Sequence, residues 1–310
     1  MDQANQTDTI PNPSVFSRRV PAERARPHEP AGRLEAILGE SPAMRQVRRL
    51  IARNSPVHIP VLICGEPGTG KDLVAAAIHN AGPRANMPFV KFNPAGAPEL
   101  MIEGELFGRE KGVLPDAPGR RVGRIEAAHR GSLLLDEPGQ FSPALQAKLL
   151  SVIQDRRFER LGGAKVRHAD VRFLVATQYD LAAAVAAGRF REDLYYRLSV
   201  LPIVLPPLRD RREDILMLAE HFARRFAARG GRPYRRIAAA AVDRLMAYPW
   251  PGNVRQLESV VERALLAADE GAIAPAPAAR VAGEPRGRVG ARDDRPRPGA
   301  KQGQHSRRRS

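Results

Sequence analysis

A glycine-rich run carries the strongest chemical signal in the sequence. It reads Gly65-Glu66-Pro67-Gly68-Thr69-Gly70-Lys71-Asp72 and separates an apolar segment from an amphipathic one. Glycines in such a turn let backbone N–H groups approach phosphate oxygens, the following helix N-terminus attracts anions, and the lysine reaches the outer phosphates. The strict pattern has Ser or Thr after the lysine to bind magnesium, where this chain has Asp72. The run predicts a phosphate-binding loop, the alternative being an ordinary flexible turn.

A pair of acidic residues forms the second signal. The run Leu133-Leu134-Leu135-Asp136-Glu137 is an apolar strand pattern that ends in two carboxylates, the first of them 65 residues after Lys71. At the end of a neighbouring parallel strand, one acid can hold magnesium and the next can orient water against a γ-phosphate. Strands that end in two acids are common, so the pairing with the glycine-rich run matters. Together the two runs predict a nucleoside triphosphatase.

The elements that must position these residues alternate along the chain. Ser41-Pro42 predicts a capped helix start. Short apolar runs predict strands at 61–64, 89–92, 132–135, 171–176 and 200–204, with helical patterns between them. Strands that alternate with helices predict an α/β fold, a parallel sheet covered by helices on both faces. After residue 207 the strand pattern stops, and three helices are expected at 211–229, 238–247 and 253–268.

These patterns divide the chain into four parts. We expect an α/β nucleotide-binding domain over residues 37–208 and a small all-helical domain over 209–272. Residues 1–36 are polar and rich in Pro and Arg, and residues 273–310 combine frequent Pro and Gly with many basic residues and almost nothing apolar. Such segments cannot bury enough apolar surface to offset their ordering entropy, so both are expected to be disordered. Neither has room or pattern for a sensory domain or a helix-turn-helix, so no sequence-specific DNA-binding module is expected in this chain.

Composition excludes several classes of protein. Hydrophobic residues make up 43% of the 310, and the net charge is +16. Of the 50 basic residues 44 are arginines, which fits either coding bias or nucleic-acid binding. No apolar run is long enough for a membrane helix, no secretory signal opens the chain, and the single Cys64 excludes a disulfide framework. A soluble, cytoplasmic protein is expected, with no membrane partner.

Beyond these patterns, the middle of the chain resembles a known family, the AAA+ ATPase domain of bacterial enhancer-binding regulators, which activate sigma-54 RNA polymerase. The similar segments occur in family order over about 235 residues: 37–47, 65–84, 89–96, 105–112, 131–137, 146–163, 190–215 and 248–258. The resemblance implies an AAA+ P-loop sheet followed by a helical lid. It also implies ATP hydrolysis with Mg²⁺ at the subunit interfaces of a ring, usually a hexamer. The family usually carries Glu after the lysine, so the acid at Asp72 is expected.

The resemblance also implies roles for individual residues. The loop from Gly65 to Asp72 binds ATP, Asp136 helps to bind Mg²⁺, and Glu137 activates water. Asn93 matches an asparagine that holds this glutamate until the site is engaged. Thr177 and Gln178 match the family's first sensor, where the second position is usually Asn. Arg191 and Arg197 match two arginines that are inserted into a neighbour's site. Arg255 matches the second sensor.

One segment departs from the family. The family's sigma-54 contact loop reads Gly-Ala-Phe-Thr-Gly-Ala, whereas the aligned residues here are Gly112-Val113-Leu114-Pro115-Asp116-Ala117. The aromatic and hydroxyl side chains are replaced, and proline makes the loop stiffer. This proline and Ala176-Thr177-Gln178 resemble the tyrosine-repressor type, which works without sigma-54. Glu110-Lys111 and residues 194–203 resemble the nitrogen-fixation activators instead, so the subgroup stays open.

Three functions are therefore weighed. The first is an ATP-hydrolysing transcription regulator that forms rings and has an altered sigma-54 contact loop. The second is a non-catalytic or sigma-54-independent nucleotide-binding regulator that assembles with a full-length relative. The third is a basic nucleic-acid-binding protein on an AAA+ scaffold. Intact Lys71, Asp136, Glu137, Arg191 and Arg197 favour the first.

Overall fold

The computed structural model describes residues 37–267, apart from 95, 114–118, 232–233 and 235. The two terminal segments that the sequence predicts to be disordered lie outside the described residues. So do Leu114, Pro115, Asp116 and Ala117 of the altered loop. Within the part that is described, none of the helices combines the length and apolar character that crossing a bilayer requires.

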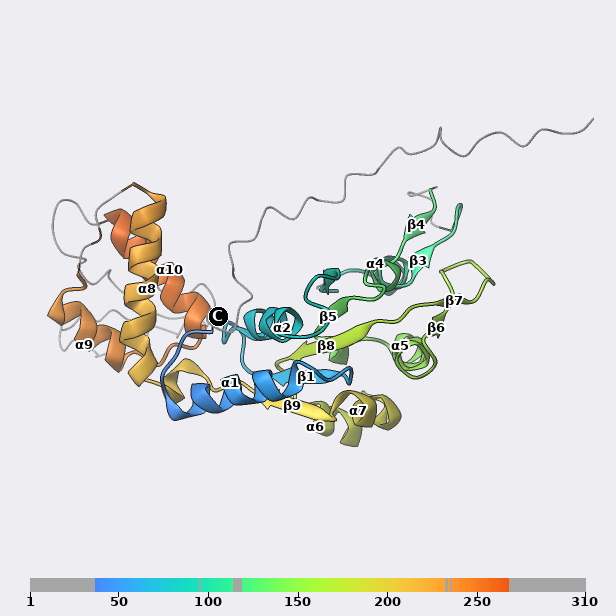
Figure 1. The fold of residues 1–310 in the computed structure, drawn as a ribbon, viewed down its shortest axis with the longest axis horizontal. Coiled ribbons are helices and arrows are strands. Elements are labelled where there is room, and N and C mark those ends of the chain that lie inside the picture. Colours follow the sequence, from blue (N-terminus) through green and yellow to red (C-terminus); the bar gives the residue numbers. More distant parts are fainter. Residues whose placement is uncertain (1–36, 95, 114–118, 232–233, 235, 268–310) are drawn as a thin grey trace, which may run out of the picture. The chain divides into compact units, whose positions relative to one another are not determined.

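A five-stranded parallel sheet forms the centre of the α/β part (Figure 1). Its strand order is β2-β5-β8-β1-β9, and every pair of neighbours runs parallel. The strands are β1 (Val61–Cys64), β2 (Phe89–Phe92), β5 (Ser132–Asp136), β8 (Arg172–Thr177) and β9 (Leu201–Val204). The sequence predicts all five to within one residue at each end. The parallel sheet and its helical cover confirm the predicted fold class.

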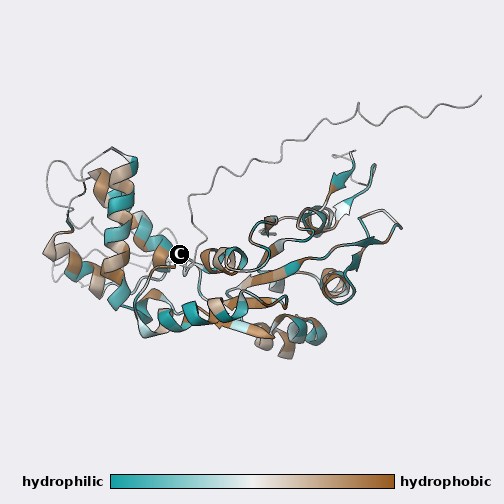
Figure 2. Ribbon diagram, in the orientation of Figure 1, coloured by the Kyte–Doolittle hydropathy of each residue, from teal (hydrophilic) through white to brown (hydrophobic). Residues whose placement is uncertain are grey.

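Helices cover both faces of this sheet. One face packs against α1 (Pro42–Asn54) and α2 (Lys71–Asn80), and the other packs against helices that follow β2 in the chain. These are α3 (Glu99–Leu106), α4 (Arg124–Ala127), α5 (Pro143–Asp155), α6 (Leu181–Ala186) and α7 (Glu192–Leu198). Adjacent leucines of β5 point to opposite cores, because side chains alternate along a strand. The central strands are accordingly apolar over most of their length, and brown predominates along them in Figure 2.

Two short hairpins at the edge of the α/β part are not predicted from the sequence. Strand β3 (Gly108–Arg109) pairs with β4 (Arg121–Val122), and β6 (Arg157–Phe158) pairs with β7 (Arg167–His168). Each strand has two residues, too few for an alternating pattern. The buried Arg160 joins the hairpins, since its guanidinium bonds Glu126 at 2.6 and 2.7 Å and Glu110 at 3.1 Å.

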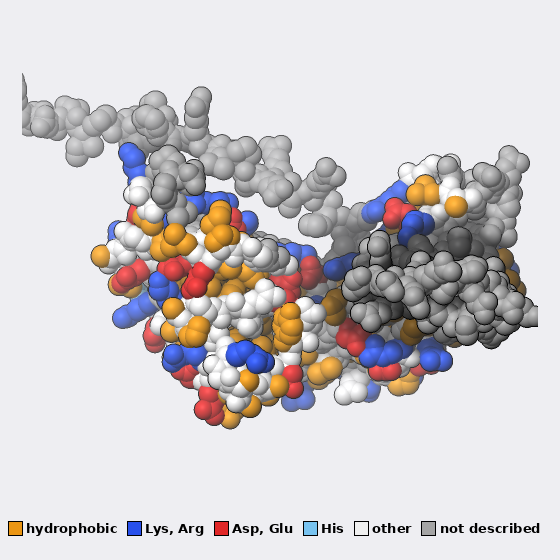
Figure 3. All heavy atoms as spheres, turned by 180° about the vertical axis from the view of Figure 1, so that it is seen from behind, with side chains coloured by type: hydrophobic (Ala, Val, Ile, Leu, Met, Phe, Trp, Pro, Cys, Tyr) orange, Lys and Arg blue, Asp and Glu red, His pale blue; other side chains and the backbone are white. Residues whose placement is uncertain are grey.

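The helical part consists of α8 (Glu213–Arg229), α9 (Ala239–Ala247) and α10 (Asn253–Ala267). These bounds confirm the three predicted helices. Helices α8 and α10 pack against each other through residues at helical spacing, among them Ile215, Phe222, Leu257 and Val261, all buried. In the view from behind, Lys and Arg side chains are interspersed with Asp and Glu over the described surface (Figure 3).

Candidate nucleotide-binding site

The glycine-rich run forms the turn between β1 and α2. Gly68 and Gly70 have left-handed φ angles of 78° and 105°, which favour glycine. A Cβ on Gly68 would lie 2.3 Å from the Gly252 carbonyl oxygen, so no side chain fits there. The turn brings the N-terminus of α2 to the wall of a cavity of about 420 Å³. Free N–H groups and the helix dipole at such an end attract anions.

Lys71 is the first residue of α2, and its side chain folds back over the turn. The ammonium donates to the carbonyl oxygens of Gly65 at 2.7 Å and Glu66 at 3.3 Å. The Thr69 hydroxyl donates to the same Glu66 carbonyl at 2.8 Å. These bonds hold the cationic side chain of Lys71 beside the cavity that it lines.

Glu137 follows β5 and has a left-handed backbone, with φ 51°. Its buried carboxylate accepts from the Thr177 hydroxyl at 3.1 Å and from the Gln178 backbone N–H at 3.0 Å. Burial raises the pKa of Glu137, and these two hydrogen bonds counteract part of that rise. Parallel pairing of β5 with β8 brings the three residues together, because both strands end at this edge of the sheet.

Asp136 lies beside Glu137 and has different partners. Burial and repulsion from Asp72 raise the pKa of its carboxyl, while Lys71 acts in the opposite direction. Asn93 donates its side-chain N–H to Asp136 at 2.8 Å. The resemblance assigns Asn93 to the glutamate instead.

The oxygens at this edge suit a magnesium ion. No described group of three or more His, Cys, Asp or Glu side chains is placed to hold a metal by itself. Magnesium is typically bound by one or two carboxylates together with substrate phosphates and water. Asp136 supplies one such carboxylate on the cavity wall, and Asp72 supplies a second there, paired with Lys91 at 3.3 Å. The donor set therefore fits Mg²⁺ bound with a nucleotide.

Helix α10 closes the cavity from the side of the lid. Val254, Arg255 and Glu258 line it, and the Arg255 backbone N–H donates to the Gly68 carbonyl at 3.3 Å. The Glu258 carboxylate is bonded to Arg225 of α8. Glu258 and Val254 are not predicted from the sequence as site residues. Glu258 lies three positions after Arg255 and four after Val254, and residues so spaced share one face of a helix, which is the signal that could have identified them.

Most of the predicted site residues meet in this cavity. Those on its wall are Pro67, Gly68, Gly70, Lys71, Asp72, Asn93, Asp136, Glu137, Gln178 and Arg255. Gln140, in the turn after Glu137, and Leu73 also line it and were missed. Four predicted residues adjoin the wall without forming it: Gly65, Glu66, Thr69 and Thr177.

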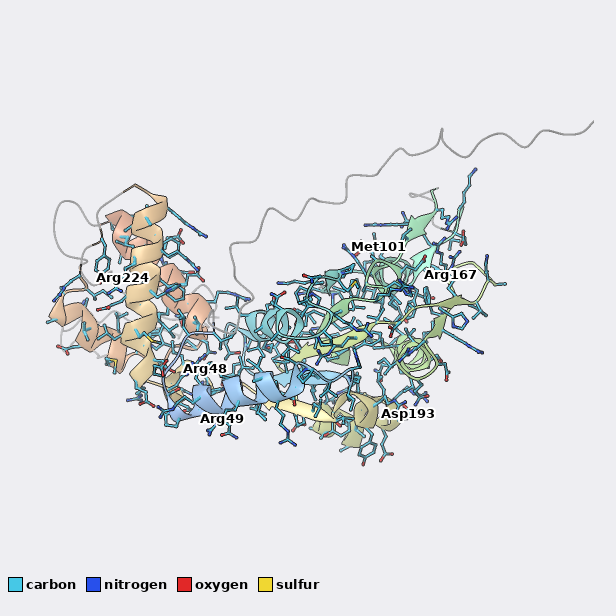
Figure 4. All side chains as sticks on the ribbon, viewed as in Figure 1. Arg48, Arg49, Met101, Arg167, Asp193 and Arg224 are labelled. Atoms are coloured by element: carbon cyan, nitrogen blue, oxygen red, sulfur yellow. The ribbon has the colours of Figure 1, made fainter. Side chains whose placement is uncertain are left out.

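The two predicted arginine fingers lie elsewhere. Neither Arg191 nor Arg197 is among the described residues that line the cavity. Arg191 stands at the N-terminal cap of α7 and forms an ion pair with Asp193 at 2.7 Å. Asp193 is labelled on α7 in Figure 4. Arg197 is an exposed residue of the same helix. Within one chain, the two arginines therefore lie on the surface and do not contribute to the candidate site.

Comparison with family models gives two matches. The sigma-54 interaction domain matches residues 37–204, and the AAA+ ATPase lid domain matches residues 209–280. Among curated proteins, the nitrogen fixation protein VnfA of Azotobacter vinelandii is 52% identical over 76% of this chain and 45% of its own length. The regulatory protein AtoC of Escherichia coli is 49% identical over 74% of this chain and 50% of its own.

Solved structures show the same likeness. The crystal structure of NtrX from Brucella abortus in complex with ADP has a TM-score of 0.71 and is 42% identical, over 76% of this chain and 53% of that one. The complex of NtrX with ATP has a TM-score of 0.70 and 43% identity, over 74% and 50%. The chain spans about half the length of the curated relatives it matches. It belongs to the sigma-54 interaction domain family of bacterial enhancer-binding transcription regulators.

Proposed function

We propose that this chain binds ATP with Mg²⁺ and hydrolyses it to ADP and phosphate, as the ATPase of a ring-forming transcription regulator. The observation that carries the proposal is the cavity in which the N-terminus of α2, Lys71, Asp136 and Glu137 meet. The NtrX structures with ATP and ADP support a nucleotide there. We further propose a nucleotide-binding domain over 37–208 and a lid over 209–272, supported by the ranges of the two family models.

Each side chain has a distinct task in this proposal. Lys71 and the first turn of α2 bind the phosphates by charge and by backbone N–H groups. Asp136 would hold Mg²⁺, which supplies positive charge to the phosphate oxygens. Glu137 orients water and accepts its proton, a task that needs an ionised carboxylate. Arg255, on α10, completes the cavity from the lid side.

We extend the proposal to a ring of subunits, with the hexamer as the expected size, on the basis of two arginines, one at the cap of α7 and one within it. Arg191 and Arg197 are exposed and lie outside the lining of the described cavity, which suits arginines that serve a neighbouring subunit. An arginine supplied in trans stabilises the charge of the phosphoryl-transfer transition state. The site of one subunit would then be complete only when a second copy docks against it.

The test measures ATP binding and turnover by the purified protein over a range of concentrations. Lys71→Ala should weaken ATP binding more than tenfold, because a charge facing the phosphates is lost. Glu137→Gln should retain binding and lose about a hundredfold or more in kcat, since only the group acting on water changes. Equal affinity in wild type and Lys71→Ala would contradict the phosphate site.

The concentration series tests the ring. Turnover per subunit should rise with protein concentration, and Arg191→Ala or Arg197→Ala should lower kcat by on the order of a thousandfold. The exposed Arg53→Ala on α1 serves as a control for loss of a surface arginine. A specific activity that stays flat from dilute to concentrated protein would rule out catalysis across subunits.

The altered loop, residues 112–117, bears on whether this chain binds sigma-54, the usual partner of the family. We propose that this chain engages sigma-54 poorly, because Leu114 lacks the aromatic face and Pro115 lacks the hydroxyl that the family presents. Buried aromatic side chains contribute heavily at small interfaces, where one truncation can cost a few kcal/mol. ATP hydrolysis and sigma-54 activation are therefore separable in this chain.

A further inference from the structure

Glu66 belongs to the phosphate-binding run, yet its carboxylate is bound by residues of the lid side. Arg209, just before α8, donates two hydrogen bonds to it at 2.6 and 2.8 Å. Asn253, the first residue of α10, donates its side-chain N–H at 3.0 Å. Glu66 is not among the described residues that line the cavity. Its carboxylate therefore joins the turn to two lid segments.

Asn253 fixes the start of α10 at this point. The residue is fully buried and has a left-handed φ of 51°. Its side-chain N–H also donates to the Pro67 carbonyl at 3.0 Å, and its side-chain oxygen accepts from the Leu208 N–H at 2.7 Å. One amide thus binds the phosphate-binding turn and the segment before α8, while its own backbone begins the lid helix.

The cavity residues of α10 follow directly. Arg255 lies two positions after Asn253, and its backbone N–H donates to the Gly68 carbonyl at 3.3 Å. The Gly252 carbonyl comes so close to Gly68 that no Cβ fits between them. The lid helix and the turn are in backbone contact here, so a shift at the start of α10 moves the guanidinium of Arg255 relative to the phosphate site.

We propose that Glu66 is a positioning residue, which holds the first turn of α10 on the phosphate-binding turn and so places Arg255 over the nucleotide. The inference rests on the proposed ATP site. A bidentate arginine–carboxylate pair fixes orientation as well as distance, which a single hydrogen bond does not. A first turn of α10 that is fixed in this way leaves fewer orientations open to Arg255, which lowers the ordering cost of nucleotide binding.

Charge and accessibility agree with this role. The hydrogen bonds from Arg209 and then from Asn253 lower the pKa of Glu66 to about 2. The carboxylate is therefore ionised over the whole range in which the protein would work. The Glu66–Arg209 pair is partly exposed, so water screens the attraction between the two charges. The pair therefore contributes orientation more than stability.

Other bonds keep the lid attached when Glu66 is changed. The buried Arg211 donates to the Thr69 carbonyl at 3.2 Å. The buried Asp214 of α8 accepts from the backbone N–H and the hydroxyl of Ser41 at 2.9 and 2.7 Å. Neither contact involves Glu66. We therefore expect Glu66 variants to fold and to retain both parts of the chain.

A double-mutant cycle on ATP affinity separates positioning from direct binding. With Mg²⁺ and ATP in isothermal titration calorimetry, Glu66→Ala should raise the Kd about tenfold in the wild-type background. In an Arg255→Ala background the same change should alter the Kd less than twofold, because the group being positioned is gone. Glu66→Gln, which keeps an oxygen for Asn253, should fall between wild type and Glu66→Ala. Glu159→Ala, at an exposed carboxylate on the β6–β7 hairpin, is the matched control.

Hydrogen exchange tests the contact without any nucleotide. The first amides of a helix have no partner within it, so the Arg255 N–H depends on Gly68 for protection. Glu66→Ala should speed exchange of the amides at 254–256 and leave those of β8 unchanged. Additive Kd effects, or unchanged exchange at 254–256, would overturn the proposal. If the wild type binds no ATP while exchange responds as expected, the ATP site is wrong and the contact between the turn and the lid stands.

Discussion

At the scale of single residues, Glu137 is subject to opposing influences. Its burial favours the protonated carboxyl, while hydrogen bonds from Thr177 and from the backbone N–H of Gln178 favour the carboxylate. Burial is the larger influence, so the pKa stays above the ordinary value of 4.5. A general base benefits from such a shift, because a pKa closer to the working pH makes proton transfer more favourable.

The expected consequence is a shift in the pH dependence of ATP turnover. The acid limb of kcat should lie at a higher pH than an ordinary glutamate would give, because burial raises the pKa of Glu137. Thr177→Val removes a hydrogen bond that lowers the Glu137 pKa, so the limb should move to higher pH. Ser151→Ala, at an exposed hydroxyl of α5, should leave the profile unchanged. A limb that moves down in Thr177→Val would contradict this account of the glutamate.

At the scale of elements, the sequence pattern predicts those helices and strands that are long enough to show a periodic pattern of apolar residues. The five strands of the sheet and the three lid helices carry apolar runs or helical spacing long enough to recognise. The two hairpins do not, because two-residue strands have no period. Glu66 shows the same limit within the site: its place in the glycine-rich run suggests nucleotide contact, whereas its bonds to Arg209 and Asn253 depend on residues 143 and 187 positions away.

The hairpins depend on a buried charge cluster. The Arg160 side chain is 1% exposed and bonds Glu126 and Glu110. Arg167, labelled in Figure 4, also pairs with Glu110 at 3.5 Å and with Glu126 at 3.7 Å. Removing the arginine takes the closest cationic partner from both carboxylates and leaves them with the longer ion pairs to Arg167 and Arg120, at 3.5 to 4.0 Å. Arg160→Met should therefore lower the free energy of unfolding by on the order of 3 kcal/mol.

A second variant checks the cause. Adding Glu126→Gln to Arg160→Met should recover part of the loss, because the carboxylate that lost its closest partner becomes neutral. Arg121→Ala breaks an exposed pair with Glu105 and should cost less than about 1 kcal/mol. Urea midpoints of the variants measure these differences. A loss in Arg160→Met no larger than that in Arg121→Ala would show that the cluster does not stabilise the hairpins.

At the scale of the whole molecule, the candidate site and the altered loop lie at separate places in the sequence. The residues that would bind and cleave ATP match the family or gather in one cavity. The contact loop differs in its four central positions, from Val113 to Asp116. Hydrolysis therefore does not imply activation of sigma-54 polymerase, and the two activities need separate measurements.

The last prediction concerns that separation. The unmodified protein should hydrolyse ATP but fail to form open complexes on a sigma-54 promoter, even at high concentration, where tethering to DNA is not required. Leu114 keeps apolar area without an aromatic face, Pro115 fixes its own φ, and Asp116 adds a charge where the family has a flexible glycine. The fourfold change Val113→Ala, Leu114→Phe, Pro115→Thr, Asp116→Gly should restore detectable binding to sigma-54 in the presence of an ATP transition-state mimic. Its ATP turnover should match that of the parent, which serves as the internal control. Robust open-complex formation by the unmodified protein would show that this loop sequence still engages sigma-54.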